Sequence, residues 1–117
     1  MSVVIWHNPR CSKSRATLKL LQENGIEPEI RLYLENPPSK DEIEIALAAL
    51  GLPAAKFVRR GEPEWKEAGL GPLNSDAELI DAMARFPKLI ERPVVLSGGA
   101  ARIGRPPESV LEIVGKG

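Results

Sequence analysis

Residues 3–25 read VVIWHNPRCSKSRATLKLLQENG, a stretch that decides the fold because it joins a buried strand to a helix through a loop that holds a cysteine. The run from Ser2 to Trp6 is short, β-branched and apolar on both faces, which is typical of a central strand in a sheet covered on both sides. Helical spacing follows in Thr17, Leu20, Leu21 and Asn24, and Gly25 is a common residue just beyond a helix end. We therefore predict a strand followed by a helix that begins near Ser12, with the cysteine at the helix N-terminus.

A second strand is predicted directly after this helix. From Glu29 to Leu34 the sequence alternates, with Ile30, Leu32 and Leu34 on one face and Arg31 and Tyr33 on the other. Together with the first strand and helix, this segment indicates a βαβ unit.

The middle of the chain has the features of a helical block. Residues 37–51 read PPSKDEIEIALAALG, in which Ser39 and Glu42 form a capping box and Gly51 is a stop signal. Ser75 and Glu78 form a second capping box before another apolar helical pattern, which Pro87 ends. We predict that residues of about 39–90 form a helical insertion.

The chain closes with a predicted hairpin and helix. The apolar run Val94–Leu96 meets the turn Gly98-Gly99, a return strand holds Arg102 and Ile103, and Pro107 opens a helix that carries Val110, Leu111 and Val114. The whole pattern of βαβ, helical block and ββα predicts an α/β protein with a thioredoxin-like fold and a single domain over residues 1–117. In open sheets of this kind ligands collect at the carboxyl ends of parallel strands, near helix N-termini.

Composition sets the broad class of the protein. The 16 basic residues balance 16 acidic ones, so the net charge offers no general attraction for nucleic acid or for a membrane surface. No apolar run approaches the length of about 20 residues that spans a bilayer. One cysteine cannot form an internal disulfide, and the N-terminal residues do not resemble a signal peptide, so we expect a cytoplasmic location. We also expect a monomer.

Cys11 is the candidate nucleophile. A lone cysteine is often a small buried apolar residue, but Cys11 is flanked by Pro9, Arg10, Ser12 and Lys13 in a predicted loop, where a core residue is not expected. Free N–H groups and the macrodipole at a helix N-terminus stabilise the thiolate, which is the reactive form of the side chain. Ser14, three residues further on, can donate a hydrogen bond to the same sulfur.

His7 is the only histidine of the chain and lies four positions before the only cysteine. One histidine and one cysteine supply too few ligands for a closed zinc site, so no metal is expected. Two roles remain open for His7 at the end of the first strand: an electrostatic influence on the thiol, or hydrogen bonds that hold the shape of the cysteine loop.

Arginines at three separate places form the second candidate feature. Arg59 and Arg60 are adjacent, Arg92 precedes Pro93, and Arg105 precedes Pro106. A guanidinium offers a planar fork of donors that suits tetrahedral oxyanions. In a thioredoxin-like fold, Arg92 and Arg105 would both approach the cysteine, and the Arg92-Pro93 bond is a candidate for a cis peptide.

The residues that carry these features resemble the glutaredoxin-coupled arsenate reductase family. The family motif H-N-P-x-C-x-x-S-R matches HNPRCSKSR, and Y-L-x-x-P-P matches YLENPP. Two further motifs correspond to the stretches ELIDAMARFPKLIERPVV and RIGRPPESVL, in the family's order and spacing. The resemblance extends from Val3 to about Val114.

This resemblance implies an arsenate reductase, an oxidoreductase in which a cysteine attacks arsenate. It implies that Cys11 is the nucleophile, that His7 and Ser14 tune the thiol, and that Arg59, Arg92 and Arg105 bind the oxyanion, although Arg60 makes the first of these assignments ambiguous by one position. It implies no bound cofactor, with glutathione as the co-substrate that resolves the adduct and glutaredoxin as the partner that reduces the mixed disulfide. A chain with one cysteine has no resolving thiol of its own, which agrees with a reductant supplied in trans.

Two alternatives remain open from the sequence. Regulators of the same fold bind RNA polymerase and sense thiol stress, but they usually carry C-x-x-C, and this chain has Ser14 at the second position. A monothiol glutaredoxin could use a C-x-x-S motif to bind glutathione or an iron–sulfur cluster, but it would have no need of three arginines.

Overall fold

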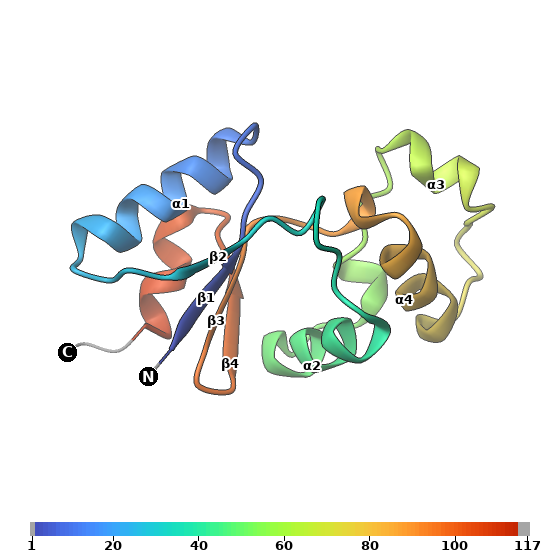
Figure 1. The fold of residues 1–117 in the computed structure, drawn as a ribbon. Coiled ribbons are helices and arrows are strands. Elements are labelled where there is room, and N and C mark those ends of the chain that lie inside the picture. Colours follow the sequence, from blue (N-terminus) through green and yellow to red (C-terminus); the bar gives the residue numbers. More distant parts are fainter. Residues whose placement is uncertain (1, 115–117) are drawn as a thin grey trace. The chain divides into compact units, whose positions relative to one another are not determined.

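The computed structural model describes residues 2–114 and divides the chain into two compact units (Figure 1). Met1–Asn36 and Arg92–Gly117 form the first, here called the sheet unit, and Pro37–Glu91 form the second, here called the helical unit. The helical unit contains the segment of about 39–90 that the sequence predicts as an insertion.

The sheet unit has the predicted βαβ and ββα halves. Its strands are β1 (Val3–Trp6), β2 (Glu29–Arg31), β3 (Val94–Ser97) and β4 (Ala100–Ile103), in the spatial order β2-β1-β3-β4. Strand β1 pairs in parallel with β2 and antiparallel with β3, which pairs antiparallel with β4. The first strand is therefore central, as its apolar sequence predicts, and the fold class is confirmed.

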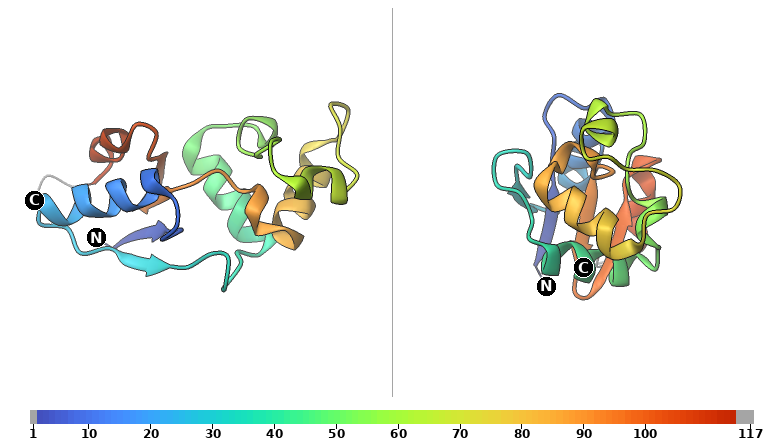
Figure 2. Two further views of the ribbon diagram at one scale, coloured as in Figure 1. Left: turned by 90° about the horizontal axis from the view of Figure 1, so that it is seen from above. Right: turned by 90° about the vertical axis from the view of Figure 1, so that its right-hand side faces the viewer.

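Two helices pack together over the sheet, α1 (Ser12–Glu23) and the 3₁₀ helix η3 (Pro107–Glu112) (Figures 1 and 2). The buried cluster beneath them joins Ile5 of β1 and Val95 of β3, which are opposite each other in the register, to Leu21 of α1 and Val110 of η3. Each such side chain contributes about 1.5–3 kcal/mol when it is fully buried. This core fixes α1, and with it the loop that precedes the helix.

Helix α1 ends as the sequence predicts. Gly25 has a φ of 78°, and its N–H donates to the Gln22 carbonyl while that of Ile26 donates to the Leu21 carbonyl. This pair of hydrogen bonds is a Schellman motif, in which glycine avoids the steric cost of a positive φ.

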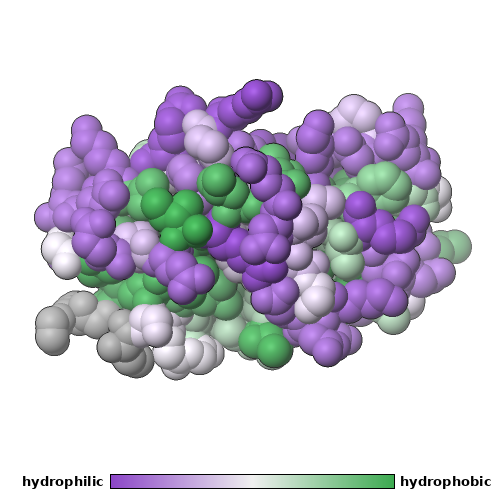
Figure 3. Space-filling view, in the orientation of Figure 1, coloured by the Kyte–Doolittle hydropathy of each residue, from purple (hydrophilic) through white to green (hydrophobic). Residues whose placement is uncertain are grey.

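Two predicted elements differ from the structure. Strand β2 ends at Arg31 rather than at Leu34, because the chain turns there and the N–H groups of Glu35 and Asn36 both donate to the Leu32 carbonyl. Tyr33 is buried, whereas Ile30, on the face predicted to be apolar, is 46% exposed. Apolar side chains are visible on the surface of this part of the protein (Figure 3).

The last helix is 3₁₀ rather than α. The N–H groups of Ser109 and Ile113 each donate to the carbonyl three residues earlier.

The helical unit consists of α2 (Lys40–Leu50), η1 (Ala54–Lys56), α3 (Pro63–Glu67), α4 (Asp76–Arg85) and η2 (Pro87–Leu89). Both predicted capping boxes are present: Ser39 and Glu42 exchange hydrogen bonds at the start of α2, and Ser75 and Glu78 do so at the start of α4. Within this unit α2 packs against α4.

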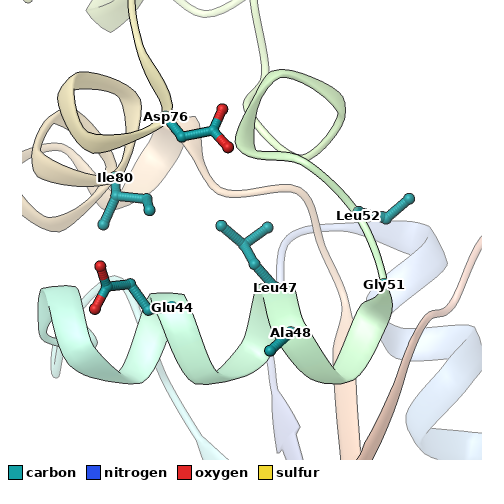
Figure 4. A pocket seen from close by; sticks show the side chains of 7 residues that line it. All are labelled: Glu44, Leu47, Ala48, Gly51, Leu52, Asp76 and Ile80. Atoms are coloured by element: carbon teal, nitrogen blue, oxygen red, sulfur yellow. The ribbon is translucent and has the colours of Figure 1, made fainter.

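An open groove of about 460 Å³ lies between α2 and α4 (Figure 4). Leu47, Ala48 and Ile80 supply apolar lining, and the carboxylates of Glu44 and Asp76 lie at its sides. These negative charges disfavour an oxyanion in this groove.

Over residues 2–114, no helix has the length and apolar character that a membrane span requires.

Candidate active site around Cys11

Cys11 is the N-cap residue of α1 and is partly buried. Partial burial raises the pKa of its thiol, but the backbone N–H of Ser14, the Arg92 side chain and the backbone N–H of Lys13 lower this pKa by more, so that the net shift is downward. Ser14 and Lys13 are the third and second residues of the helix, whose N–H groups normally bond to an N-cap side chain. Cys11 thus stands at the N-cap position, although its side chain makes no capping hydrogen bond in the structure.

Hydrogen bonds within residues 8–15 hold the cysteine loop in shape. The Asn8 carbonyl accepts from the Cys11 N–H at 3.0 Å, and the Asn8 side chain accepts from the Arg10 N–H at 3.0 Å. The guanidinium of Arg15 donates to the Pro9 carbonyl at 2.9 Å. The sequence predicts no role for Asn8, although an Asn-Pro pair is a turn signal.

His7 and Ser14 contact each other. The sequence suggests that the Ser14 hydroxyl donates to the sulfur, but in the structure this hydroxyl lies against His7 instead. The His7 Nδ1 lies 2.7 Å from Ser14 Oγ, which also accepts a hydrogen bond from the Asn8 N–H at 3.0 Å. Both side chains are buried. Burial, and then the positive charge of Arg15, lower the pKa of His7, so the neutral ring is favoured at pH 7. The tautomer of this ring sets whether Nδ1 donates to the Ser14 hydroxyl or accepts from it.

Ser14 therefore acts on the sulfur through its backbone N–H, while its hydroxyl links α1 to the end of β1. Of the two roles left open for His7, the hydrogen bonds support the one in which it holds the loop in shape.

Two of the predicted arginines lie beside the sulfur. Arg105 Nη2 donates to Cys11 Sγ at 3.8 Å, and the Arg92 side chain hydrogen-bonds to the same thiol and lowers its pKa. Arg105 Nε also donates to the Arg92 carbonyl at 2.8 Å, which ties the two loops together. The Arg92-Pro93 peptide bond is cis, as expected, and so is the Arg105-Pro106 bond, which the sequence analysis did not anticipate.

Arg59 belongs to the helical unit, where two carboxylates hold it. Its Nη1 lies 2.9 Å from Glu91 and its Nη2 lies 3.3 Å from Glu62. A backbone hydrogen bond of 2.7 Å from the Arg59 N–H to the Leu89 carbonyl brings Arg59 close to Glu91. The neighbouring Arg60 is instead exposed and stacks over the Trp65 ring at 5.6 Å. The two candidates for the first arginine therefore differ in their surroundings.

The arrangement in the sheet unit favours one kind of chemistry. A thiolate at a helix N-terminus, next to two guanidinium groups, can attack the central atom of a tetrahedral oxyanion while the guanidinium groups bind the oxygens. Over residues 2–114 no three His, Cys, Asp or Glu side chains gather as a metal site would require.

The chain is similar to known proteins over nearly its whole length. The model of the ArsC family matches residues 6–113. An uncharacterised Escherichia coli protein, YfgD, is 54% identical over 97% of this chain and 97% of its own length. An arsenate reductase of Haemophilus influenzae is 47% identical over 97% of this chain and all of its own. The structure of an arsenate reductase from Vibrio cholerae superimposes with a TM-score of 0.93 at 52% identity, covering 97% of this chain and 98% of that one. The protein therefore belongs to the ArsC family.

Proposed function

We propose that the protein is an arsenate reductase in which Cys11 is the nucleophile. The observation that carries the proposal is the pair of guanidinium groups, from Arg92 and Arg105, at a cysteine whose thiol pKa is lowered. Family membership and arsenate reductase relatives support the choice of arsenate among the tetrahedral oxyanions.

In the first step the thiolate attacks arsenic. A sulfur–arsenic bond forms, and one arsenate oxygen leaves as water after it takes up protons. Arg92 and Arg105 offset the negative charge on the remaining oxygens, and the charge-assisted hydrogen bonds that they donate orient the anion. The arsenic is still As(V) in this adduct.

Reduction requires two electrons from external thiols, because the chain has a single cysteine. A glutathione thiolate attacks the Cys11 sulfur, the sulfur–arsenic bond breaks, and its electron pair remains on arsenic, which leaves as arsenite. Glutaredoxin then attacks the glutathione sulfur of the mixed disulfide and releases the Cys11 thiolate. The proposal includes a cytoplasmic location, where thiols are kept reduced, and action as a monomer.

The proposal extends to Arg59 as a third ligand of the oxyanion. Its chemistry and the resemblance to the family support this role, and its ion pairs with Glu62 and Glu91 hold the guanidinium in a defined orientation.

A coupled assay tests the function. NADPH oxidation is followed in the presence of glutathione reductase, glutaredoxin and glutathione, with and without arsenate. We expect arsenate-dependent oxidation with the wild-type protein and none above background with Cys11→Ser. A wild-type rate no faster than that of Cys11→Ser would show that the proposal is wrong.

Arg102→Ala is a matched control for Arg92→Ala and Arg105→Ala. Arg102 also belongs to the sheet unit, but its Nε pairs with Glu112 at 2.9 Å. Loss of a partly exposed ion pair of this kind costs little stability. We expect kcat/KM for arsenate to fall about tenfold or more in Arg92→Ala and Arg105→Ala, as for loss of a hydrogen bond to a charged group, and to change little in Arg102→Ala.

A further inference from the structure

Gly104 lies directly before Arg105, at a point where three segments of the sheet unit meet. A β-carbon at this position would collide with Thr17 Oγ1 of α1, would lie 2.8 Å from Cγ of Pro93, and would lie 3.1 Å from Thr17 Cγ2. All three residues are buried. Only glycine allows the backbone before Arg105 to approach α1 and the Pro93 loop this closely.

Backbone conformation is not the reason for the glycine. Gly104 is not among the residues with a positive φ, so alanine could adopt its backbone geometry. The restriction is one of space, and it can therefore be relieved by removing the atoms that fill the space.

The same contact joins the segments that carry the site. The Gly104 N–H donates to the Pro93 carbonyl at 2.9 Å, one residue from Arg92. Thr17 donates to the Lys13 carbonyl at 2.8 Å in the first turn of α1, and its hydroxyl lies 3.5 Å from the Gly104 carbonyl. Any outward movement of Gly104 would carry Arg105 away from the turn that presents Cys11.

We propose that Gly104 and Thr17 are positioning residues whose close contact sets the distance between the Arg105 guanidinium and the Cys11 sulfur, and thereby the affinity for the oxyanion. This inference rests on the proposed function for the identity of the anion. It assigns the two residues no contact with the substrate.

Protection of Cys11 from alkylation tests the proposal without requiring turnover. The rate of iodoacetamide modification is measured at increasing arsenate concentrations, which gives the concentration that halves the rate. For Gly104→Ala we expect this half-protective concentration to rise about tenfold, the size expected when one charge-assisted hydrogen bond to an anion is lost. Gly71→Ala is the matched control, because Gly71 has open space around its Cβ position and no positive φ.

Second-site substitutions at Thr17 separate positioning from a general loss of structure. Thr17→Ala removes both threonine atoms that crowd position 104 but leaves Pro93 Cγ 2.8 Å from the new β-carbon. Gly104→Ala combined with Thr17→Ala should therefore recover part of the lost protection. Thr17→Ser keeps the closest atom, Oγ1, and should not restore protection. If Gly104 acts through Arg105, adding Gly104→Ala to Arg105→Gln should change protection less than about twofold, because the effects of coupled residues are not additive.

The outcomes are distinct. Wild-type protein that arsenate does not protect would contradict the proposed function. Protected wild-type protein together with a folded Gly104→Ala variant that is protected equally well would overturn the positioning proposal alone. If Gly104→Ala does not fold, the double variant with Thr17→Ala decides: folding with partly restored protection supports the proposal, and an unfolded or unprotected double variant overturns it.

Discussion

Cys11 is the N-cap residue of α1, and the presence of a thiol at this position has a chemical consequence. Serine, threonine or aspartate at an N-cap binds the free N–H groups of the first turn through oxygen. Here the N–H groups of Ser14 and Lys13 act on the sulfur instead. The backbone at the start of the helix therefore favours the thiolate, although the sulfur makes no capping hydrogen bond.

The first prediction at this scale concerns thiol reactivity. Burial raises the pKa of Cys11, but the Ser14 N–H, Arg92 and the Lys13 N–H together lower it by more. Alkylation should therefore reach half its maximal rate at a lower pH than for a free cysteine. Arg92→Ala should move this midpoint upward, because one of the groups that stabilise the thiolate is removed. Iodoacetamide rates measured across pH check both shifts, and Arg102→Ala should leave the midpoint in place. An unchanged midpoint in Arg92→Ala would contradict the role given to this arginine.

The second prediction concerns His7 and pH. Burial is the main cause of its lowered pKa, so between this native value and the ordinary value of 6.5 the unfolded chain binds a proton that the folded protein does not. The free energy of unfolding should therefore be highest above pH 6.5, the ordinary pKa of histidine. It should fall as the pH drops from this value toward the lower pKa of His7 in the folded protein. Urea denaturation at about pH 7.5 and about pH 5.5 measures the loss.

His7→Asn is the control for this measurement. The chain has no other histidine, and the ordinary values of Glu78 and Asp81, 4.5 and 3.8, lie below the window. The variant should show a smaller change between the two pH values. An equal change in both proteins would assign the loss to other groups.

Sequence patterns indicated the residues of the candidate site but not their hydrogen-bond partners. The sequence alone was enough to place Cys11 in a strand-to-helix loop and to find the arginines that precede prolines, because local residue patterns mark helix starts and loops. The bond between Ser14 Oγ and His7, and the crowding at Gly104, depend on the packing of segments far apart in the chain. Contacts of this kind cannot be predicted from the residues near each position in the sequence.

At the scale of elements, the helices with capping boxes were the easiest to predict. The box signals at Ser39 and Ser75 act within four residues, and the structure contains both. Strand β2 was predicted too long because alternation alone cannot show that the chain turns after Arg31. The 3₁₀ form of η3 was also missed, since its apolar spacing suits either helix type.

The third prediction concerns the start of α4. Ser75 Oγ accepts a hydrogen bond from the Glu78 N–H at 3.2 Å, and the Glu78 carboxylate accepts from the Ser75 N–H at 2.8 Å. Ser75→Ala should lower the free energy of unfolding by about 1 kcal/mol, because one helix N–H loses its partner. Glu78→Gln keeps an acceptor for the Ser75 N–H and should cost less. Urea denaturation of the two variants checks the order, and a larger loss for Glu78→Gln would contradict it.

At the scale of the whole molecule, equal numbers of basic and acidic residues mean that an anion has to be recognised by local groups rather than by the net charge. With 16 basic and 16 acidic residues, the chain has no net positive charge to attract a doubly charged oxyanion. The groove between α2 and α4 adds carboxylates rather than arginines to its surface. Under the proposed function, affinity for arsenate would therefore come from particular guanidinium groups.

The last prediction uses this balance to resolve the ambiguity between Arg59 and Arg60. Arg59→Ala and Arg60→Ala change the net charge equally, so any difference between them cannot come from the general field of the protein. We expect Arg59→Ala to raise the half-protective arsenate concentration for Cys11 about tenfold, as for loss of a charged hydrogen bond. Arg60→Ala removes only a stack on Trp65 and should cost about 0.5–1 kcal/mol of stability with protection unchanged. Equal protection in the two variants would remove Arg59 from the oxyanion ligands, and a reversed order would assign the role to Arg60.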